Sequence, residues 1–120
     1  LLQDTARLQQ VPRGLDGPQA EAFLATVNID TAVLAATGYS AGAGFTVGSY
    51  TENSLKRRVI QKADKVILLI DRSKLGRTLP FTFASLSDID VVICDAPLPE
   101  DFIQAARAAG TEVLQVQPAK

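Results

Sequence analysis

Four short apolar runs recur along the chain, and longer stretches with helical spacing separate them. The runs are residues 31–36, 65–70, 91–94 and 112–116. Three of them are continuously apolar rather than alternating, which is typical of strands that are buried on both faces of a parallel sheet. Strands that alternate with helices in this way predict an α/β domain whose parallel strands are joined by right-handed crossovers.

The intervening stretches predict three helices. Gly17-Pro18 opens the first, because proline suits the first helical position. The second covers residues 51–63 with Thr51 as its N-cap, and the third begins near Pro99 and has Gly110 as its C-cap. Apolar residues at helical spacing form the predicted inward faces, namely Ala20, Phe23, Leu24, Val27, Leu55, Val59, Ile60, Ala63, Phe102, Ile103, Ala106 and Ala109.

Two segments lie outside this pattern. Phe81-Thr-Phe83 predicts a short extra strand within an otherwise irregular stretch. Residues 1–16 predict no regular element, and residues 9–14 are predicted to form a loop because they combine polar residues with proline and glycine.

Length and charge narrow the class of protein. A chain of 120 residues accommodates one domain. Its 12 lysines and arginines nearly balance its 13 aspartates and glutamates, for a net charge of −1, which argues against nucleic-acid binding by this segment itself. No apolar run approaches the roughly 18 residues that cross a bilayer, and the N-terminus lacks the apolar core of a signal peptide. We therefore expect a cytoplasmic protein without membrane contact.

Rare and absent residue types exclude further classes of site. The chain has no histidine, which excludes Ser-His-Asp and Cys-His nucleophile pairs and zinc sites that need imidazole. Its single cysteine, Cys94, cannot form an internal disulfide and lies in a predicted strand, so we expect it in the core. We predict no cofactor and no metal. Because the chain has no methionine, we expect it to be a piece of a longer polypeptide, although removal of a signal peptide or propeptide could also take the initiator methionine.

Ligands of open α/β sheets bind beyond the carboxyl ends of the strands, and three segments follow predicted strands here. The first, residues 37–48, contains four glycines, but Gly42-Ala-Gly44-Phe-Thr-Val-Gly48 is one residue too long for a dinucleotide fingerprint and lacks the lysine of a Walker A loop. Its glycines favour either close approach to a ligand or a flexible surface crossover. Tyr39 and Tyr50 flank these glycines, and either could stack on a sugar or cover the end of the sheet.

The second segment, Asp71-Arg-Ser-Lys74, places a carboxylate, a hydroxyl and an ammonium within four residues. This set suits a phosphorylated polyol, because the carboxylate accepts hydrogen bonds from sugar hydroxyls and lysine attracts the phosphate. Taken alone, the motif is explained better by a solvated turn in which Asp71 caps Ser73 or Lys74. The third segment begins at Asp95 and ends at Pro99.

Glu52 and Lys56 are spaced i, i+4 on the second predicted helix. Such a pair is usually a surface ion pair, although Glu52 in the first turn would lie beside a ligand crevice. The basic residues of this region, Lys56, Arg57, Arg58, Lys62 and Lys65, favour a solvated face over a nucleic-acid contact, because no aromatic residues alternate with them.

These motifs occur together in one order. Thr37-Gly-Tyr-Ser, Gly44-Phe-Thr46, Glu52-x-x-x-Lys56-Arg57, Asp71-Arg-Ser-Lys74-x-Gly76 and Leu86-Ser-Asp-Ile-Asp90-x-x-Ile93-x-Asp95 follow one another along the chain. As a set, over residues 15–117, they closely resemble the C-terminal sensor domain of DeoR/GlpR-type bacterial transcriptional regulators.

The resemblance implies a three-layer parallel-sheet α/β domain similar to sugar-phosphate isomerases and CoA transferases. It also implies a phosphorylated sugar or polyol as effector, an N-terminal helix-turn-helix head that binds operator DNA, and a homo-oligomer. Neither the head nor the family's first phosphate loop is recognisable before Leu15, so the resemblance makes residues 1–120 the C-terminal portion of a sensor domain. The ligand-binding residues that it implies are Gly38, Tyr39, Gly44, Thr46, Glu52, Lys56, Asp71, Ser73 and Lys74.

Asp71-x-Ser-Lys74 also resembles the corresponding segment of ribose-5-phosphate isomerases, and Glu52 falls near their catalytic glutamate. The alternative hypothesis is therefore an isomerase in which Glu52 moves a proton between two sugar carbons and Lys74 balances the charge. Ala43-Gly-Phe45 replaces the glycine-lysine loop of those enzymes. Regulation without catalysis is the main prediction.

Overall fold

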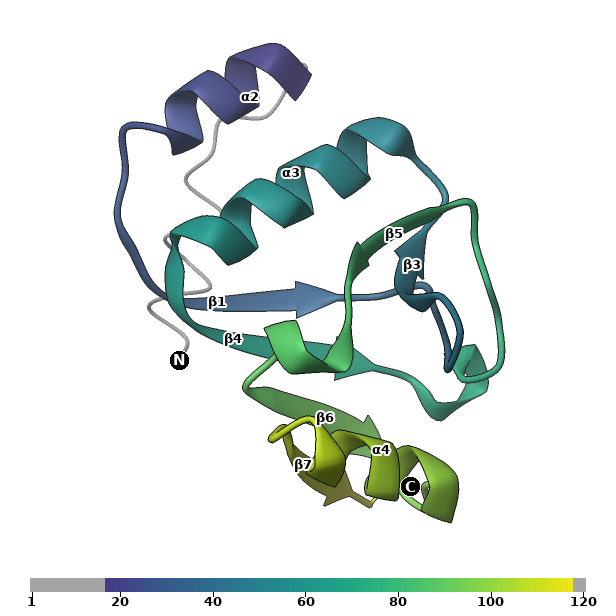
Figure 1. The fold of residues 1–120 in the computed structure, drawn as a ribbon. Coiled ribbons are helices and arrows are strands. Elements are labelled where there is room, and N and C mark those ends of the chain that lie inside the picture. Colours follow the sequence, from purple (N-terminus) through teal and green to yellow (C-terminus); the bar gives the residue numbers. More distant parts are fainter. Residues whose placement is uncertain (1–16, 118–120) are drawn as a thin grey trace.

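The computed structural model describes residues 17–117, and a four-stranded parallel sheet forms their centre (Figure 1). Its strands lie in the order β1 (Ile29–Ala35), β4 (Ala63–Ile70), β6 (Val91–Asp95) and β7 (Glu112–Val116). All four confirm the apolar runs that predicted them. β1 and β4 each begin two residues earlier than predicted, because the pairing of Ile29 with Ala63 extends the ladder beyond the apolar run.

Three helices confirm the predicted helical stretches. They are α2 (Gly17–Leu24), α3 (Tyr50–Lys62) and α4 (Glu100–Ala108). α3 lies on the connection from β1 to β4 and leads directly into β4, and α4 joins β6 to β7, while α2 packs on the outer side of α3 (Figure 1). No helix in residues 17–117 is both long enough and apolar enough to cross a membrane.

The ends of two helices differ from the prediction by one or two residues. The N-cap of α3 is Ser49 rather than Thr51, and its hydroxyl accepts a hydrogen bond from the backbone N–H of Glu52 at 3.3 Å. Ser49-Tyr-Thr-Glu52 matches the serine-to-glutamate spacing that favours a helix start, a signal that the apolar stripe alone does not contain. The C-cap of α4 is Ala109, and Gly110 follows it with φ of +80°.

A second, antiparallel sheet stands beside the first. It consists of β2 (Gly38–Ser40), β3 (Gly44–Val47) and β5 (Phe81–Ala84), and β5 confirms the predicted extra strand. β2 and β3 lie within the glycine-rich segment, so the interpretation of that segment as a flexible crossover is wrong. Phe45, Thr46 and Val47 are fully buried, and their burial holds the hairpin in place.

All described helices cover the same face of the parallel sheet. The side chains of β4 and β6 that point to this face belong to one core cluster with residues of β2, β3, β5 and α4. Its members from the two central strands are Val66, Leu68, Ile70, Val92 and Cys94. Cys94 is 1% exposed, which confirms that it is a core residue. A smaller cluster joins α2 and α3 to the same face of β1 through Ala32.

The opposite face of the sheet is more open only toward the carboxyl ends of the strands, since Ile67 and Val91 on that face are 7% and 6% exposed. Leu69, Leu114 and Val116 are between 42% and 47% exposed. The prediction that the continuous strands are buried on both faces is therefore wrong at Leu69. The physical reason is the topology: the chain steps across the sheet in one direction from β1 to β7, and crossovers of one hand that step in one direction all lie on one face.

The predicted fold class is confirmed, since a parallel sheet with helical crossovers forms the described part of the chain. The arrangement is consistent with a three-layer α/β domain. Two short 3₁₀ helices, η1 (Arg72–Lys74) and η2 (Leu86–Asp88), follow β4 and β5. Residues 1–16, including the predicted loop at 9–14, lie outside the described residues.

Candidate functional site

A cavity of about 550 Å³ lies at the carboxyl ends of the parallel strands. Its apolar wall is formed by strand residues such as Ala35, Leu69, Ile93 and Val116. Its charged groups come from the segment that follows β4 and from the last residue of β6, as the rule for open α/β sheets predicts. They are Asp71, Lys74 and Asp95.

Asp71 and Lys74 reach this cavity because of a tight turn. The Oδ1 atom of Asp71 accepts a hydrogen bond from the backbone N–H of Ser73 at 3.1 Å, which caps η1 and confirms the predicted solvated turn. The same turn brings Lys74 back to the cavity wall, where it is half-buried. Ser73 is exposed and is not among the cavity residues within 17–117. The turn and the ligand-site interpretations are therefore compatible.

Asp95 is a site residue that the sequence analysis did not choose, although it named the segment that Asp95 begins. Its Oδ1 atom accepts a hydrogen bond from the backbone N–H of Arg72 at 2.6 Å, and this bond is the main reason why the pKa of Asp95 is lowered. The Arg72 guanidinium donates to the carbonyl oxygen of Ala96 at 3.1 Å. These bonds hold the ends of β4 and β6 together. The signal in the sequence was the position of Asp95 at the end of a strand.

Burial raises the pKa of the Cys94 thiol to about 11, and the neighbouring carboxylate of Asp95 adds to this shift. The thiol therefore remains protonated at neutral pH, which is typical of an unreactive core cysteine. The cavity thus offers two carboxylates that accept hydrogen bonds from hydroxyl groups and one ammonium that attracts an anion.

Four predicted ligand residues lie instead in the packed hairpin. The hydroxyl of Thr46, which is fully buried, accepts a hydrogen bond from the backbone N–H of Leu79 at 3.0 Å. A Cβ atom on Gly38 would lie 2.6 Å from the carbonyl oxygen of Arg77, and one on Gly44 would lie 2.5 Å from that of Ala84. Gly44 also has φ of +82°, which favours glycine. The contacts of these residues serve the packing of β2 and β3.

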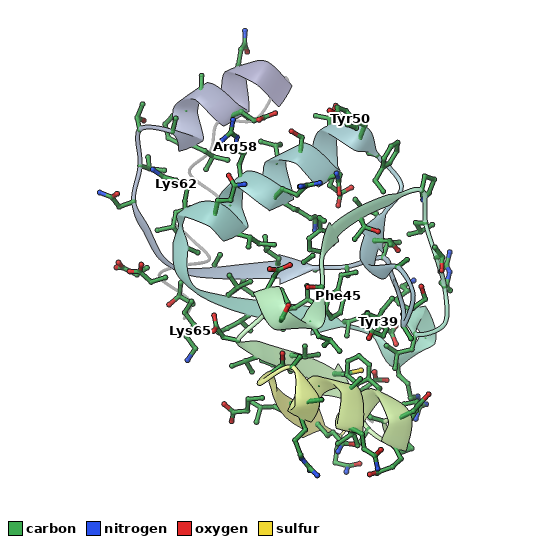
Figure 2. All side chains as sticks on the ribbon, in the orientation of Figure 1. Tyr39, Phe45, Tyr50, Arg58, Lys62 and Lys65 are labelled. Carbon is green, nitrogen blue, oxygen red and sulfur yellow. The ribbon has the colours of Figure 1, made fainter. Side chains whose placement is uncertain are left out.

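Tyr39, the fourth of them, is 8% exposed and packs between two phenylalanines. Its ring centroid lies 4.8 Å from that of Phe45 and 5.0 Å from that of Phe102. Burial raises the pKa of its hydroxyl. Figure 2 shows Tyr39 and Phe45 in the interior and Tyr50 at the outer end of α3, where Tyr50 is 68% exposed. Tyr39 thus covers the sheet end, which was one of its two predicted roles.

Glu52 and Lys56 form the predicted ion pair, with 3.4 Å between Glu52 Oε2 and Lys56 Nζ. It is not a simple surface pair, because the Lys56 side chain is only 14% exposed. The Lys56 ammonium donates to the carbonyl oxygen of Ala35 at the end of β1 and lies 5.2 Å from the centre of the Phe83 ring. Burial lowers its pKa, and Glu52 opposes that shift. Within the described residues, the cavity wall includes neither Glu52 nor Lys56.

The predicted basic group is spread over several environments. Arg58 is paired with Glu21 of α2 at 3.2 Å, and the Lys62 ammonium donates to the carbonyl oxygen of Ala25 at 3.4 Å. Figure 2 shows both side chains directed toward α2, while Lys65 points away from the helices. These residues therefore do not form one continuous basic surface.

Comparison with known protein families decides the class. Residues 6–96 match the family model described as the DeoR C-terminal sensor domain. The chain belongs to this family. The resemblance of the combined motifs is thus confirmed over most of the chain.

Characterised relatives of this DeoR-family chain are regulators of transcription. It is 36% identical over 107 residues to the HTH-type transcriptional regulator GlpR of Haloferax volcanii, covering 89% of the chain and 42% of the relative. It is 32% identical over 108 residues to the HTH-type transcriptional repressor GlcR of Bacillus subtilis, covering 90% and 42%. It is 30% identical over 91 residues to the glycerol-3-phosphate regulon repressor of Escherichia coli, covering 76% and 36%. The chain spans less than half the length of these relatives.

Proposed function

We propose that this chain is the effector-binding part of a transcriptional repressor of sugar or polyol catabolism, and that it forms the C-terminal portion of the sensor domain. Its effector is a phosphorylated sugar or polyol that binds at the carboxyl ends of β1, β4 and β6. The observation that carries the proposal is the cavity that brings Asp71, Lys74 and Asp95 together in a chain of the DeoR sensor family.

The chemistry of the cavity fits this class of effector. The Lys74 ammonium has no hydrogen-bond or ion-pair partner within residues 17–117, so it is available to a phosphate. Asp71 and Asp95 each accept a backbone hydrogen bond and retain capacity for ligand hydroxyls, since a carboxylate accepts several. The apolar strand residues between them suit the carbon skeleton of a sugar or polyol.

Binding without catalysis is the proposal that the contacts favour. The isomerase hypothesis needs Glu52 as a free base beside a sugar whose charge Lys74 balances. The Glu52 carboxylate is paired with Lys56 instead, and the residues that line the cavity of Lys74 do not include it within the described part of the chain. The names of the relatives describe regulators and repressors of transcription, which also favours sensing.

Three further properties belong to this proposal. A helix-turn-helix head outside this chain binds operator DNA, and effector binding shifts the equilibrium between states that do and do not bind the operator. The regulator is a homo-oligomer. It functions in the cytoplasm, where phosphorylated sugars are found and where a repressor meets its operator.

A thermal-shift screen tests the proposal. We expect at least one phosphorylated sugar or polyol, with glycerol 3-phosphate as the first compound, to raise the melting temperature of the protein. Lys74→Ala should remove this shift, because the phosphate loses its counter-charge. Lys65→Ala is the matched control, since Lys65 is an exposed lysine at the other end of β4. If no sugar phosphate raises the melting temperature, or if Lys74→Ala and Lys65→Ala respond alike, the proposed site is wrong.

A further inference from the structure

The ammonium group of Lys56 is largely withdrawn from water. The Lys56 side chain is 14% exposed, and its ammonium pairs with the carboxylate of Glu52, one helical turn earlier on α3. The ammonium also lies 5.2 Å from the centre of the Phe83 ring of β5. Removing an ammonium from water costs free energy unless other charges and hydrogen-bond partners replace the water. The fold therefore provides a set of partners for this one charge.

One of these partners is the backbone at the carboxyl end of β1. The Lys56 ammonium donates a hydrogen bond to the carbonyl oxygen of Ala35. The N–H of Ala36 belongs to the same peptide group and donates to the carbonyl oxygen of Leu69 in β4 at 3.4 Å. Because a trans peptide directs its C=O and its N–H in opposite directions, the Ala35 carbonyl points away from β4. Among residues 17–117, Lys56 is the side chain that binds it.

The same end of β1 forms one wall of the effector cavity. Ala35 and Ala36, here called the β1 wall, line the cavity together with Asp71 and Lys74. β4 holds the β1 wall from one side through the Ala36 N–H, and Lys56 holds it from the other. Lys56 itself is not a cavity residue in the described part of the chain. It therefore acts on the cavity through the backbone of Ala35.

We propose that Lys56 is a positioning residue of the effector cavity, and that its hydrogen bond to Ala35 holds the β1 wall in the place that effector binding requires. The inference rests on the proposed function. Without the ammonium, the Ala35–Ala36 peptide group is held by the bond from Ala36 to β4, and at 3.4 Å this bond is longer than the usual ~2.9 Å. The β1 wall then shifts more easily.

The contacts favour this role over direct binding of the phosphate by Lys56. Two of the three N–H donors of its ammonium are directed to Glu52 and Ala35, and the Phe83 ring lies beside it. The Lys74 ammonium, by contrast, lies at the cavity wall without a partner among the described residues. The two lysines therefore divide the work: Lys74 attracts the phosphate, and Lys56 holds the backbone of the opposite wall.

Lys62 provides a matched control on the same helix. Its ammonium also donates to a backbone carbonyl, that of Ala25 at 3.4 Å, but neither residue lines the effector cavity within residues 17–117. Lys56→Met and Lys62→Met each keep an unbranched side chain and remove one ammonium. We expect Lys56→Met to raise the Kd for glycerol 3-phosphate roughly tenfold, because a small displacement of a supporting group costs a site much of its fit. Lys62→Met should leave this Kd unchanged.

Two measurements separate positioning from a merely structural role. Titration calorimetry, well below the melting temperatures of the variants, measures effector binding independently of lost stability. Lys56→Arg should restore most of the affinity, because a guanidinium keeps the charge and has donors for both Ala35 and Glu52. In the free protein, Lys56→Met should shift the NMR amide resonance of Ala36, whose peptide group contains the Ala35 carbonyl, whereas Lys62→Met should not.

The proposal is overturned if Lys56→Met binds glycerol 3-phosphate as tightly as the unaltered protein, since Lys56 then has only a structural role. Weaker binding without a shift at Ala36 would identify direct contact with the phosphate and would also overturn it. If no sugar phosphate binds the unaltered protein while Lys56→Met shifts Ala36, the proposed function fails and the positioning of the β1 wall stands.

A measurement on the unaltered protein covers the case in which Lys56→Met does not fold. The ¹⁵N resonances of the lysine ammonium groups are followed while glycerol 3-phosphate is added. We expect the resonances of Lys74 and Lys56 to move together, because the effector contacts the wall that Lys56 holds, and that of Lys62 to stay in place. A Lys56 resonance that stays in place while that of Lys74 moves would contradict the proposal.

Discussion

Two regions of the molecule looked like ligand sites in the sequence, because each lies where a predicted strand ends. One is the packed hairpin of β2 and β3, and the other is the cavity at the ends of β4 and β6. Their polar groups are used differently. In the hairpin, the Thr46 hydroxyl accepts a backbone hydrogen bond and the Tyr39 ring packs between two phenylalanines. In the cavity, the Lys74 ammonium lies at the wall without a partner among the described residues.

The difference teaches how to separate a structural motif from a binding motif. The glycines and the tyrosine of the hairpin are explained by packing alone. The backbone of β5, for example, occupies the space beside Gly44 where a side chain would lie. The carboxylates of Asp71 and Asp95 accept backbone hydrogen bonds and keep further capacity for a ligand. We therefore expect substitutions in the hairpin to change stability and substitutions in the cavity to change effector binding.

Tyr39 provides the largest expected effect on stability. Tyr39→Ala removes a ring that contacts Phe45 and Phe102, and should lower the free energy of unfolding by about 3–5 kcal/mol. Tyr39→Phe keeps the ring and should cost less than about 1 kcal/mol. Urea denaturation measures both. If Tyr39→Phe folds normally but abolishes the thermal shift with glycerol 3-phosphate, Tyr39 contacts the effector and the contrast between the two regions is wrong.

The next largest expected effect on stability comes from a comparison of Gly44 with Gly42. Gly44→Ala should lower the free energy of unfolding by about 2–3 kcal/mol, because alanine at φ of +82° is strained and its Cβ would meet the Ala84 carbonyl oxygen. Gly42→Ala is the matched control, since no atom lies within 4 Å of its Cβ position, and it should change stability by less than about 1 kcal/mol. Equal stability of the two variants in urea would show that the hairpin tolerates movement there.

Asp95 provides the smallest expected effect on stability and sharpens the cavity side of the comparison. The hydrogen bond from the Arg72 N–H lowers its pKa below the ordinary value of 3.8, so the unfolded chain binds this proton more readily than the folded one. The resulting stability is present above pH 3.8 and is lost as the pH falls through the folded-state pKa.

Asp95→Asn should remove this part of the acid dependence, as measured by the free energy of unfolding against pH. It should also weaken effector binding at neutral pH, where it removes one acceptor for hydroxyls. Ser73→Ala, in the neighbouring turn but outside the cavity wall, is the control and should leave both properties unchanged. An acid profile of Asp95→Asn that coincides with that of the unaltered chain would contradict the assignment.

Local patterns were sufficient for most of the fold. The apolar runs predicted all four parallel strands, and helical spacing predicted α2, α3 and α4, because burial of side chains at fixed intervals is itself what stabilises these elements. The cap of α3 was missed because Ser49 and Thr51 are both good capping residues, and the backbone decides between them. The hairpin was missed because its strands contain three and four residues, too few for a visible alternation.

The candidate site was predicted in part. The motif Asp71-x-x-Lys74 was recognisable because a strand end is a fixed place in an α/β sheet, and the cavity includes both residues. Glu52 and Lys56 were placed with them on the strength of a resemblance, but their contacts are with each other, with β1 and with β5. Asp95 lies at the cavity because β6 pairs with β4, and this pairing joins segments that are far apart in the sequence.

The sequence by itself determined the four strands of the parallel sheet, the three α-helices and the short strand β5, since each follows from residue type and local spacing. It also predicted a class of ligand for the strand ends. The tertiary structure decided which face of the sheet is covered, because the direction of the crossovers depends on the order of the strands. It also decided which polar groups remain available. Thr46 and Lys74 both carry hydrogen-bonding groups, and their neighbours in space decide how each group is used. The Thr46 hydroxyl is bound to the backbone of Leu79, whereas Lys74 lies at the cavity wall.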